Sequence, residues 1–143
     1  MRLWHPSLLP FLPRQQLLGQ HRECCAMRGL GWGRKHSVVD YVWEHPRSWL
    51  VRYHLQVIAE MENRGYNVTD TWRLPQYRGK RCECEKIDMR EARDYPEHDD
   101  GYLFECLENL EAKGHDLWLK VGVSEVSGER YTMRGDDERG NRQ

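Results

Sequence analysis

Polar and apolar positions follow a helical period in three stretches of the chain. The clearest stretch carries six residues at positions i, i+3, i+4, i+7, i+8 and i+11, namely Leu50, Tyr53, His54, Val57, Ile58 and Met61. This spacing places them on one face of an α-helix, which predicts a helix over residues 48–64 that ends at Gly65. A first long helix is expected over residues 13–27, and a third over residues 101–113.

The N-terminal residues lack this period and are rich in proline. Pro6, Pro10 and Pro13 each bias the residue before them toward extended backbone. We therefore expect residues 1–12 to cross the surface as an irregular arm. After the first long helix, a short helix is expected over residues 38–44, because the His-Pro pair that follows stops it.

The second half of the chain has a weaker pattern. Residues 82–93 are expected to hold a short, charged helical piece, and residues 117–126 alternate enough for a strand or an extended packing segment. Residues 127–143 contain almost nothing apolar, which predicts a disordered polar tail. The expected fold is therefore all-α: a compact single domain of three main helices with long loops and little strand, over residues 1–126.

Composition places the chain among soluble proteins. It has 143 residues, of which 31% are charged, and its mean hydropathy is −0.91. No apolar run approaches the roughly 18–20 residues that a membrane span needs. Prolines interrupt the apolar start of the chain and no small-residue cleavage site follows it, so we expect a cytoplasmic protein without a signal peptide.

The five cysteines are an odd number and occur as Cys24-Cys25, Cys82-x-Cys84 and Cys106. This is neither a disulfide framework nor the paired spacing of a zinc site. We expect reduced thiols that mostly pack as small apolar side chains, and no bound metal. His54, on the apolar face of the second helix, is interpreted as a packed histidine rather than a ligand.

A net charge of −1 conceals an asymmetry between the two halves. Residues 1–80 hold twelve Lys and Arg against six Asp and Glu, whereas residues 81–143 hold ten against seventeen. The first half is thus +6 and the second −7. A basic surface opposite an acidic one suits a partner such as nucleic acid, because phosphate contacts supply most of the nonspecific affinity for it.

The chemistry-bearing residues concentrate in the first predicted helix. Glu23 is a single carboxylate among Arg22 and Arg28, and Arg34-Lys35-His36 follows closely. The simpler interpretation is that the apolar residues of this helix face the core and the charged residues are its solvated side. The sequence contains no GxxxxGK[ST], GxSxG, HExxH or GxGxxG, so the usual signatures of nucleotide-binding proteins, hydrolases and zinc peptidases are absent.

Four stretches resemble, in the same order, the pyrimidine dimer DNA glycosylase family of the phage endonuclease V type. The first is residues 12–23, whose strongest positions are Gln15, Leu17, Arg22 and Glu23. The others are Arg34-Lys35-His36, residues 58–60 with 64–68 and 70–71, and, more faintly, residues 77–79 with 95–98. The resemblance covers the first half of the chain well and the second half loosely.

This resemblance implies an all-α enzyme that removes a base at a cyclobutane pyrimidine dimer and then nicks the strand by β-elimination. Its nucleophile would be the N-terminal α-amine, here that of Met1, which attacks the sugar C1′ and forms an imine. Glu23 would stabilise the positive charge at the sugar and assist proton transfer. An α-amine has a reference pKa of about 8, so a useful fraction is nucleophilic at neutral pH without a metal or a cofactor.

The same resemblance implies a set of residues that contact DNA: Arg2, Gln16, Arg22, Arg28, Arg34, Lys35 and His36. Gln16 stands where the family usually has a histidine. The partner would be double-stranded DNA with a lesion, whose target nucleotide must be flipped out of the stack. The protein is expected to act as a monomer, without a membrane or a small-molecule cofactor.

Two other functions stay open. A nucleic-acid-binding helical module that keeps the fold without chemistry would show salt-sensitive DNA binding and no nicking. A small protein-interaction domain, using its acidic second half, would show no DNA affinity near physiological salt.

Overall fold

The computed structural model describes residues 2–29, 39–126 and 129–132. Its three α-helices are α1 (Arg14–Arg28), α2 (Arg47–Asn63) and α3 (Asp100–Ala112). One short 3₁₀ helix precedes α1, namely η1 (Pro6–Phe11), and three lie between the α-helices: η2 (Asp40–Glu44), η3 (Asp70–Arg73) and η4 (Met89–Glu91). The three predicted helices and the all-α class are confirmed, each helix displaced by a single residue from the expected range.

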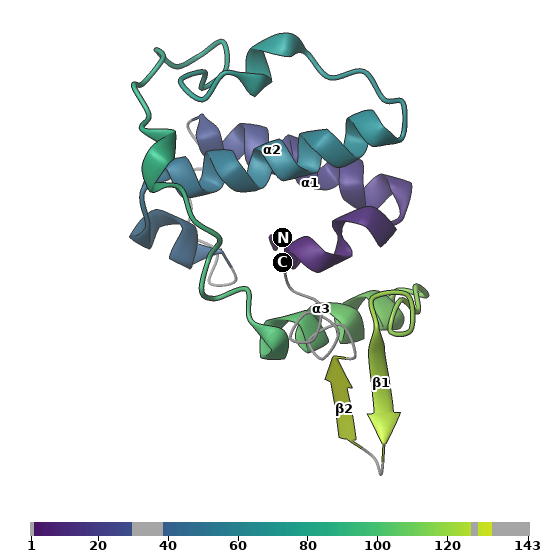
Figure 1. Cartoon of the computed structure of the whole chain (residues 1–143). Coiled ribbons are helices and arrows are strands. Elements are labelled where there is room, and N and C mark those ends of the chain that lie inside the picture. Colours follow the sequence, from purple (N-terminus) through teal and green to yellow (C-terminus); the bar gives the residue numbers. More distant parts are fainter. Residues whose placement is uncertain (1, 30–38, 127–128, 133–143) are drawn as a thin grey trace.

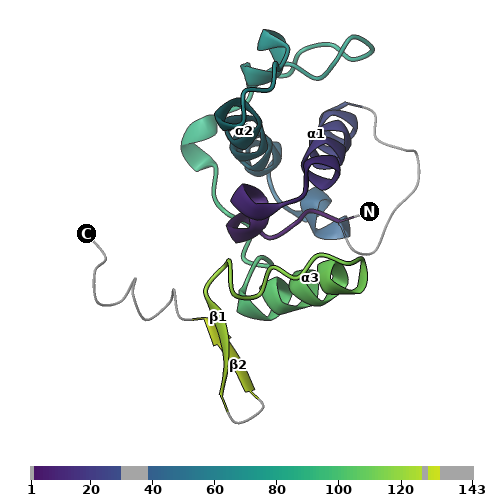
Figure 2. The same ribbon diagram turned by 90° about the vertical axis from the view of Figure 1, so that its right-hand side faces the viewer.

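The helices form two layers with the N-terminal segment between them. α1 and α2 lie side by side, and α3 lies across from them, with η1 in between (Figure 1). The view along α1 and α2 shows the same arrangement (Figure 2). The long connection from α2 to α3 contains η3 and η4 and runs around the outside of the α1–α2 pair.

The start of the chain is part of the core. Leu3 and Leu8 are completely buried and Leu12 is 2% exposed. The prediction that residues 1–12 cross the surface as an arm is therefore wrong. Pro6 occupies the first turn of η1, where a missing N–H is tolerated, and the burial of the leucines outweighs the extended bias that the prolines impose.

Two further expectations change at the level of local structure. β1 (Val123–Val126) and β2 (Glu129–Thr132) pair as an antiparallel hairpin, with Val123 opposite Thr132. Residues 129–132 are thus a strand rather than part of a disordered tail, and the rest of residues 127–143 lies outside the described part. Within residues 82–93 the only helical turn is η4, because that segment lacks an apolar face to bury.

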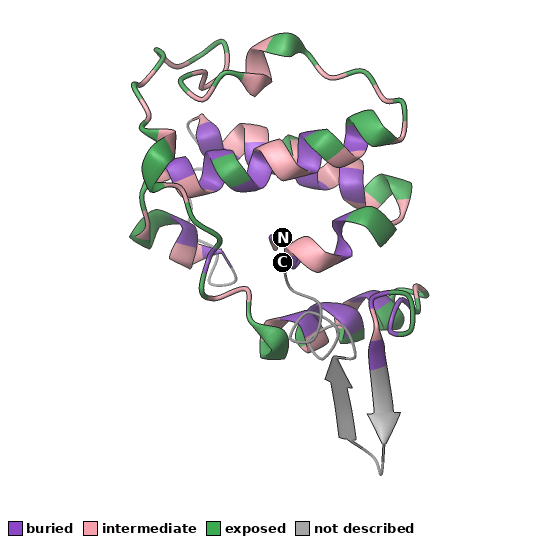
Figure 3. Cartoon of the chain, in the orientation of Figure 1, coloured by how far each residue is buried: buried purple, intermediate pink, exposed green. Residues whose placement is uncertain are grey.

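The core draws on all three helices (Figure 3). Leu17 and Met27 of α1, Val57 of α2 and Leu107 of α3 are completely buried. None of the five cysteines forms a disulfide in the structure; Cys24 and Cys106 are buried, and Cys84 is exposed. In the described part of the chain, no helix has both the length and the apolar character to cross a bilayer.

A cluster of aromatic rings connects the two layers around His98. Its ring stacks on Tyr102, with 5.3 Å between ring centroids, and its Nε2 lies 2.5 Å from the Tyr41 hydroxyl. Burial, together with the nearby His5, lowers the pKa of His98 to about 4. The ring is therefore neutral at physiological pH and is an uncharged part of the packing.

We expect this histidine to make the fold acid-sensitive. In the unfolded chain His98 is protonated below its usual pKa of 6.5, whereas in the folded protein it is protonated only below about pH 4. The free energy of unfolding therefore falls as the pH drops from 6.5 to 4. The loss should reach about 2–3 kcal/mol near pH 4.5. Urea unfolding as a function of pH measures it, and His98→Gln should flatten the curve in this range. An equally steep curve in the variant would contradict the assignment.

Candidate active site

A pocket of about 380 Å³ lies between α1, the N-terminal segment and α3. Eight residues line it: Arg2, Trp4, Gln15, Gln16, Gly19, Glu23, Asn109 and Lys113. The pocket thus combines residues from the start of the described chain and α1 with residues from α3. Glu23 is the one acid among its lining residues, facing the basic side chains of Arg2 and Lys113.

The Glu23 carboxylate is half-buried in this wall. Burial raises its pKa above the usual value for a glutamate, against the opposing effect of Arg22 and Lys113. A carboxylate in such surroundings binds protons more readily than an exposed one. It can therefore stabilise a positive charge in its ionised form and act as a proton acceptor or donor.

Gln20 fixes the first residues of the chain beside this carboxylate. Its buried side-chain oxygen accepts a hydrogen bond from the backbone N–H of Trp4 at 2.6 Å, and its nitrogen donates to the carbonyl of Arg2 at 3.1 Å. The Tyr53 hydroxyl of α2 lies 2.5 Å from the Trp4 carbonyl, and that of Tyr102 of α3 lies 2.5 Å from the Leu3 carbonyl. All three helices thus hold residues 2–4 at the pocket.

Gln20→Leu, which keeps the side-chain volume, should lower the free energy of unfolding by about 2–3 kcal/mol. It leaves the Trp4 N–H and the Arg2 carbonyl without partners, and each buried, unpaired group costs about 1–3 kcal/mol. Gln15→Leu, at an exposed position of the same helix, is the matched control and should change stability by no more than about 0.5 kcal/mol. Urea unfolding compares them, and equal stabilities would argue against this anchoring.

Arg2 forms a rigid part of the pocket wall. Its Nη1 lies 3.3 Å from Glu105 of α3, and its guanidinium lies 5.8 Å from the ring centroid of Trp4 and 5.9 Å from that of Tyr102. Lys113 covers the Trp4 ring as well, with Nζ 5.4 Å from its centroid. Two cations thus flank one indole at the mouth of the site.

The structure brings some of the predicted site residues together. Arg2, Gln16 and Glu23 share the pocket. Arg22 is exposed on α1. Its Nη2 atom lies beside Gly19, 3.8 Å from the position that a Cβ atom on this glycine would occupy. The other predicted positions, Met1, Arg34, Lys35 and His36, lie outside the described residues.

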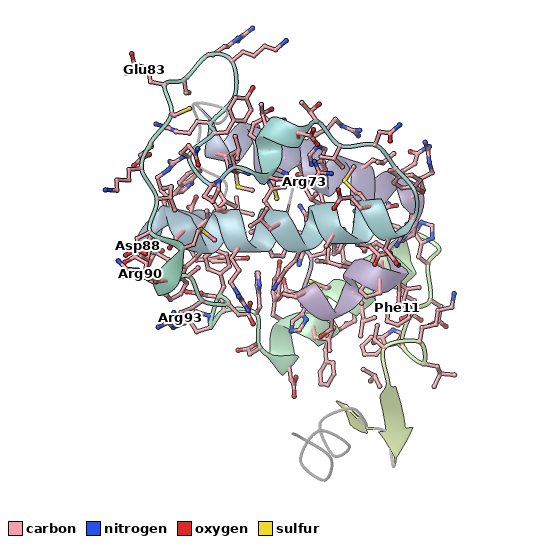
Figure 4. The ribbon with its side chains drawn as sticks, turned by 45° about the horizontal axis from the view of Figure 1, so that its top comes forward. Phe11, Arg73, Glu83, Asp88, Arg90 and Arg93 are labelled. Carbon is pink, nitrogen blue, oxygen red and sulfur yellow. The ribbon has the colours of Figure 1, made fainter. Side chains whose placement is uncertain are left out.

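Arg28 requires a correction, because its side chain is 1% exposed and points into the protein. Its Nη1 donates to the carbonyl of Trp72 at 2.8 Å, and its Nη2 to those of Leu74 at 2.8 Å and Tyr77 at 2.9 Å. The segment that supplies these carbonyls includes η3, which carries the labelled Arg73 and lies over the α1–α2 pair (Figure 4). Because its guanidinium is buried, with both Nη atoms bonded to backbone carbonyls, Arg28 is not placed to hold a phosphate.

Sequence reasoning missed the two residues that α3 contributes. Asn109 and Lys113 are four positions apart and therefore lie on one side of the helix. The side-chain oxygen of Asn109 is buried with no hydrogen-bond partner among the described residues. The sequence does show polar residues in a row beside the apolar face of the third helix. It does not show that this row lines the same pocket as Glu23.

The fold and the site define a small helical protein with an acid-base pocket built around the start of its chain. Comparison with known families then gives a specific assignment: the profile of the family described as "Pyrimidine dimer DNA glycosylase" matches residues 1–74, and this chain belongs to that family. The match confirms the resemblance inferred from the sequence. It ends before α3, so Asn109 and Lys113 lie outside the matched region. The curated proteins and the solved structures compared with this chain gave no match.

Proposed function

We propose that this protein removes the base at a pyrimidine dimer in duplex DNA and then cleaves the strand at the resulting abasic site, through an imine with the α-amine of Met1. Membership of the glycosylase family makes it a DNA glycosylase and makes lesion-bearing DNA its substrate. The observation that carries the rest is the pocket in which Glu23 and the first residues of the chain meet.

The position of Arg2 supports an amine nucleophile. Arg2 and Trp4 both line the pocket that contains Glu23, and the Cα atom of a preceding residue can be no more than about 3.8 Å from that of Arg2. We therefore propose that a terminal amine one residue before Arg2 reaches a sugar bound in the pocket. Its reference pKa of about 8 leaves part of it neutral at physiological pH.

In the first step the amine nitrogen would attack C1′ of the flipped nucleotide. The C1′–base bond breaks, the electron pair leaves with the base, and ring opening converts the attached sugar into an imine. The carboxylate of Glu23 stabilises the positive charge that develops at C1′. Arg2 and Lys113, on either side of the indole of Trp4, bind phosphates next to the lesion.

In the second step Glu23 would accept a proton from C2′. The electrons of that C–H bond form a C2′–C3′ double bond, and the C3′–O bond breaks with the phosphate as leaving group. Water then hydrolyses the imine and frees the amine. These steps balance without a metal ion or a cofactor. We propose that the protein carries them out as a monomer.

DNA contacts would extend from the pocket along α1. Gln16 and Arg22 lie on the side of the helix that bears the pocket. Arg34, Lys35 and His36, which follow α1 in the chain, are proposed to contact the backbone further along. Such a surface neutralises phosphates on both sides of the lesion while α3 closes the opposite wall of the pocket.

Borohydride trapping tests the proposal directly. The protein is incubated with duplexes that contain either a thymine dimer or an abasic site, and borohydride then reduces the imine to a stable covalent link. A protein–DNA band that persists with a chelator, and that disappears when the N-terminus is blocked by acetylation, is expected. Absence of the band on both duplexes would overturn the imine mechanism.

The same assay separates the two alternatives. Salt-sensitive binding to the duplex with no covalent band and no nicking would favour a non-catalytic nucleic-acid-binding module. No binding near physiological salt would favour a protein-interaction domain.

A further inference from the structure

A second polar cluster lies on α1, on a different side of the helix from the candidate active site. His21 and Cys25, one turn apart on α1, meet His54 of α2, and one potential ligand atom from each lies within 4.8 Å of the others. His21 Nδ1 is 2.9 Å from His54 Nε2. The sulfur of Cys25 is 3.9 Å from each of these nitrogens.

These separations are close to the edges of a tetrahedral metal site. Zinc bond lengths of about 2.0–2.1 Å to nitrogen and about 2.3 Å to sulfur require about 3.3 Å between two nitrogens and about 3.6 Å between nitrogen and sulfur. The observed distances differ from these by only a few tenths of an ångström. Side-chain rotations alone can therefore bring all three donors to bonding distance of one ion.

The ligand types agree with this geometry, although the thiol of Cys25 must lose a proton to bind an ion, because burial raises its pKa to about 11. Burial lowers the pKa of both His21 and His54, and nearby arginines lower it further. A lowered pKa favours the neutral imidazole, which is the form that binds metals. Two imidazoles and one thiolate are a donor set that suits a borderline-soft divalent cation such as Zn²⁺.

The cluster is also accessible. Cys25 lines a second pocket, of about 340 Å³, together with Trp72 and residues 78–82. Of the three cluster residues only Cys25 lines this pocket, so an ion would approach the cluster from the side of the Cys25 sulfur. Three protein ligands with one open position is the arrangement of a reactive or exchangeable zinc site rather than of a closed structural one.

Arg28 contacts one of the proposed ligands and should lower the affinity of the site for a metal ion. Its Nη1 lies 3.0 Å from His54 Nδ1, and since a guanidinium only donates, the proton of neutral His54 lies on Nε2 and points to His21. To bind an ion through Nε2, His54 must carry its proton on Nδ1 instead, which disrupts the contact with Arg28, and Cys25 must release its thiol proton to solvent. The free ring N–H of a metal-bound histidine usually donates to a carbonyl or carboxylate. Loss of such a hydrogen bond lowers metal affinity by about 10–100-fold.

We propose that His21, Cys25 and His54 form an exchangeable Zn²⁺-binding site that opens to the pocket at Trp72. The site is separate from the pocket around Glu23 and does not depend on the glycosylase mechanism. Its ligands come from α1 and α2, so a bound ion would link α2 to the helix that carries Gln16 and Arg22 of the proposed DNA surface.

Cobalt binding tests the proposal on the reduced, full-length protein. Co²⁺ bound to a thiolate gives a charge-transfer band in the near ultraviolet, which should saturate at one equivalent and disappear when Zn²⁺ is added. Cys25→Ser should abolish the band and weaken Zn²⁺ binding by about 100-fold or more. Cys84→Ser changes an exposed cysteine outside the cluster and should leave both unchanged.

His54→Gln is the second test variant, because it removes a ligand without touching the thiol. It should weaken Co²⁺ binding and alter the visible bands that report coordination geometry. Circular dichroism verifies that each variant is folded. Lack of the thiolate band in the wild-type protein, or an undiminished band in folded Cys25→Ser, would overturn the proposal.

Discussion

Replacing Glu23 by glutamine should lower the rate of strand cleavage at an abasic site by a factor of about 10²–10⁴. Glutamine keeps the size and the hydrogen-bonding capacity of the side chain, but it has no negative charge to stabilise the sugar cation and cannot accept the C2′ proton. Single-turnover cleavage of an abasic duplex, with enzyme in excess, measures this effect without a contribution from product release.

The matched control is Glu44→Gln. Glu44 is an exposed acid in η2 and does not line the pocket, so the substitution changes the net charge equally and should leave cleavage unchanged. Because burial raises the pKa of Glu23, cleavage by the wild type should also decline on acidification at a higher pH than an ordinary glutamate would produce. A Glu23→Gln rate within threefold of wild type would remove Glu23 from the mechanism.

The helices were predictable because each has a local cause. The apolar period of α2 is complete within one stretch of sequence, and Gly65, with φ of 84°, adopts the left-handed conformation expected where a helix ends. Glu23 was predictable for a similar reason, since it stands in a continuous stretch that resembles a family. Local pattern was sufficient wherever the residues that define a feature are neighbours in the chain.

The N-terminal segment and the pocket depend on distant contacts instead. Leu3 is buried because its carbonyl meets Tyr102 of α3, 99 positions away, and no local rule about proline contains that information. Lys113 likewise reaches Glu23 only through the packing of α3 against the start of the chain. The same holds for the His21–Cys25–His54 cluster, because its third member comes from another helix.

Arg28 shows how one residue type supports two opposite interpretations. Its position on α1, one turn after Glu23, suggested a phosphate contact. The structure instead surrounds it with the carbonyls of Trp72, Leu74 and Tyr77, which come from a loop with little regular structure of its own. A loop that turns several carbonyls inward needs an internal donor, and arginine supplies five N–H groups from one side chain.

Arg28→Ala should therefore lower the free energy of unfolding by about 3–5 kcal/mol, the range for removing one partner of a buried charged network. The substitution leaves several buried carbonyls unpaired, each at a cost of about 1–3 kcal/mol. It also removes the contact between the guanidinium and the Trp72 ring, whose centroid is 5.2 Å away. Urea unfolding followed by tryptophan fluorescence is the measurement, since Trp72 lies at the centre of the affected region.

The control for this substitution is Arg52→Ala. Arg52 pairs with Asp94 at 2.9 Å, but its side chain is 44% exposed and that of its partner 60%, so the pair should contribute about 1 kcal/mol or less. If Arg28→Ala were no more destabilising than Arg52→Ala, the guanidinium would not be what holds residues 72–77 against α1. A large difference between the two would instead show that this arginine acts inside the fold.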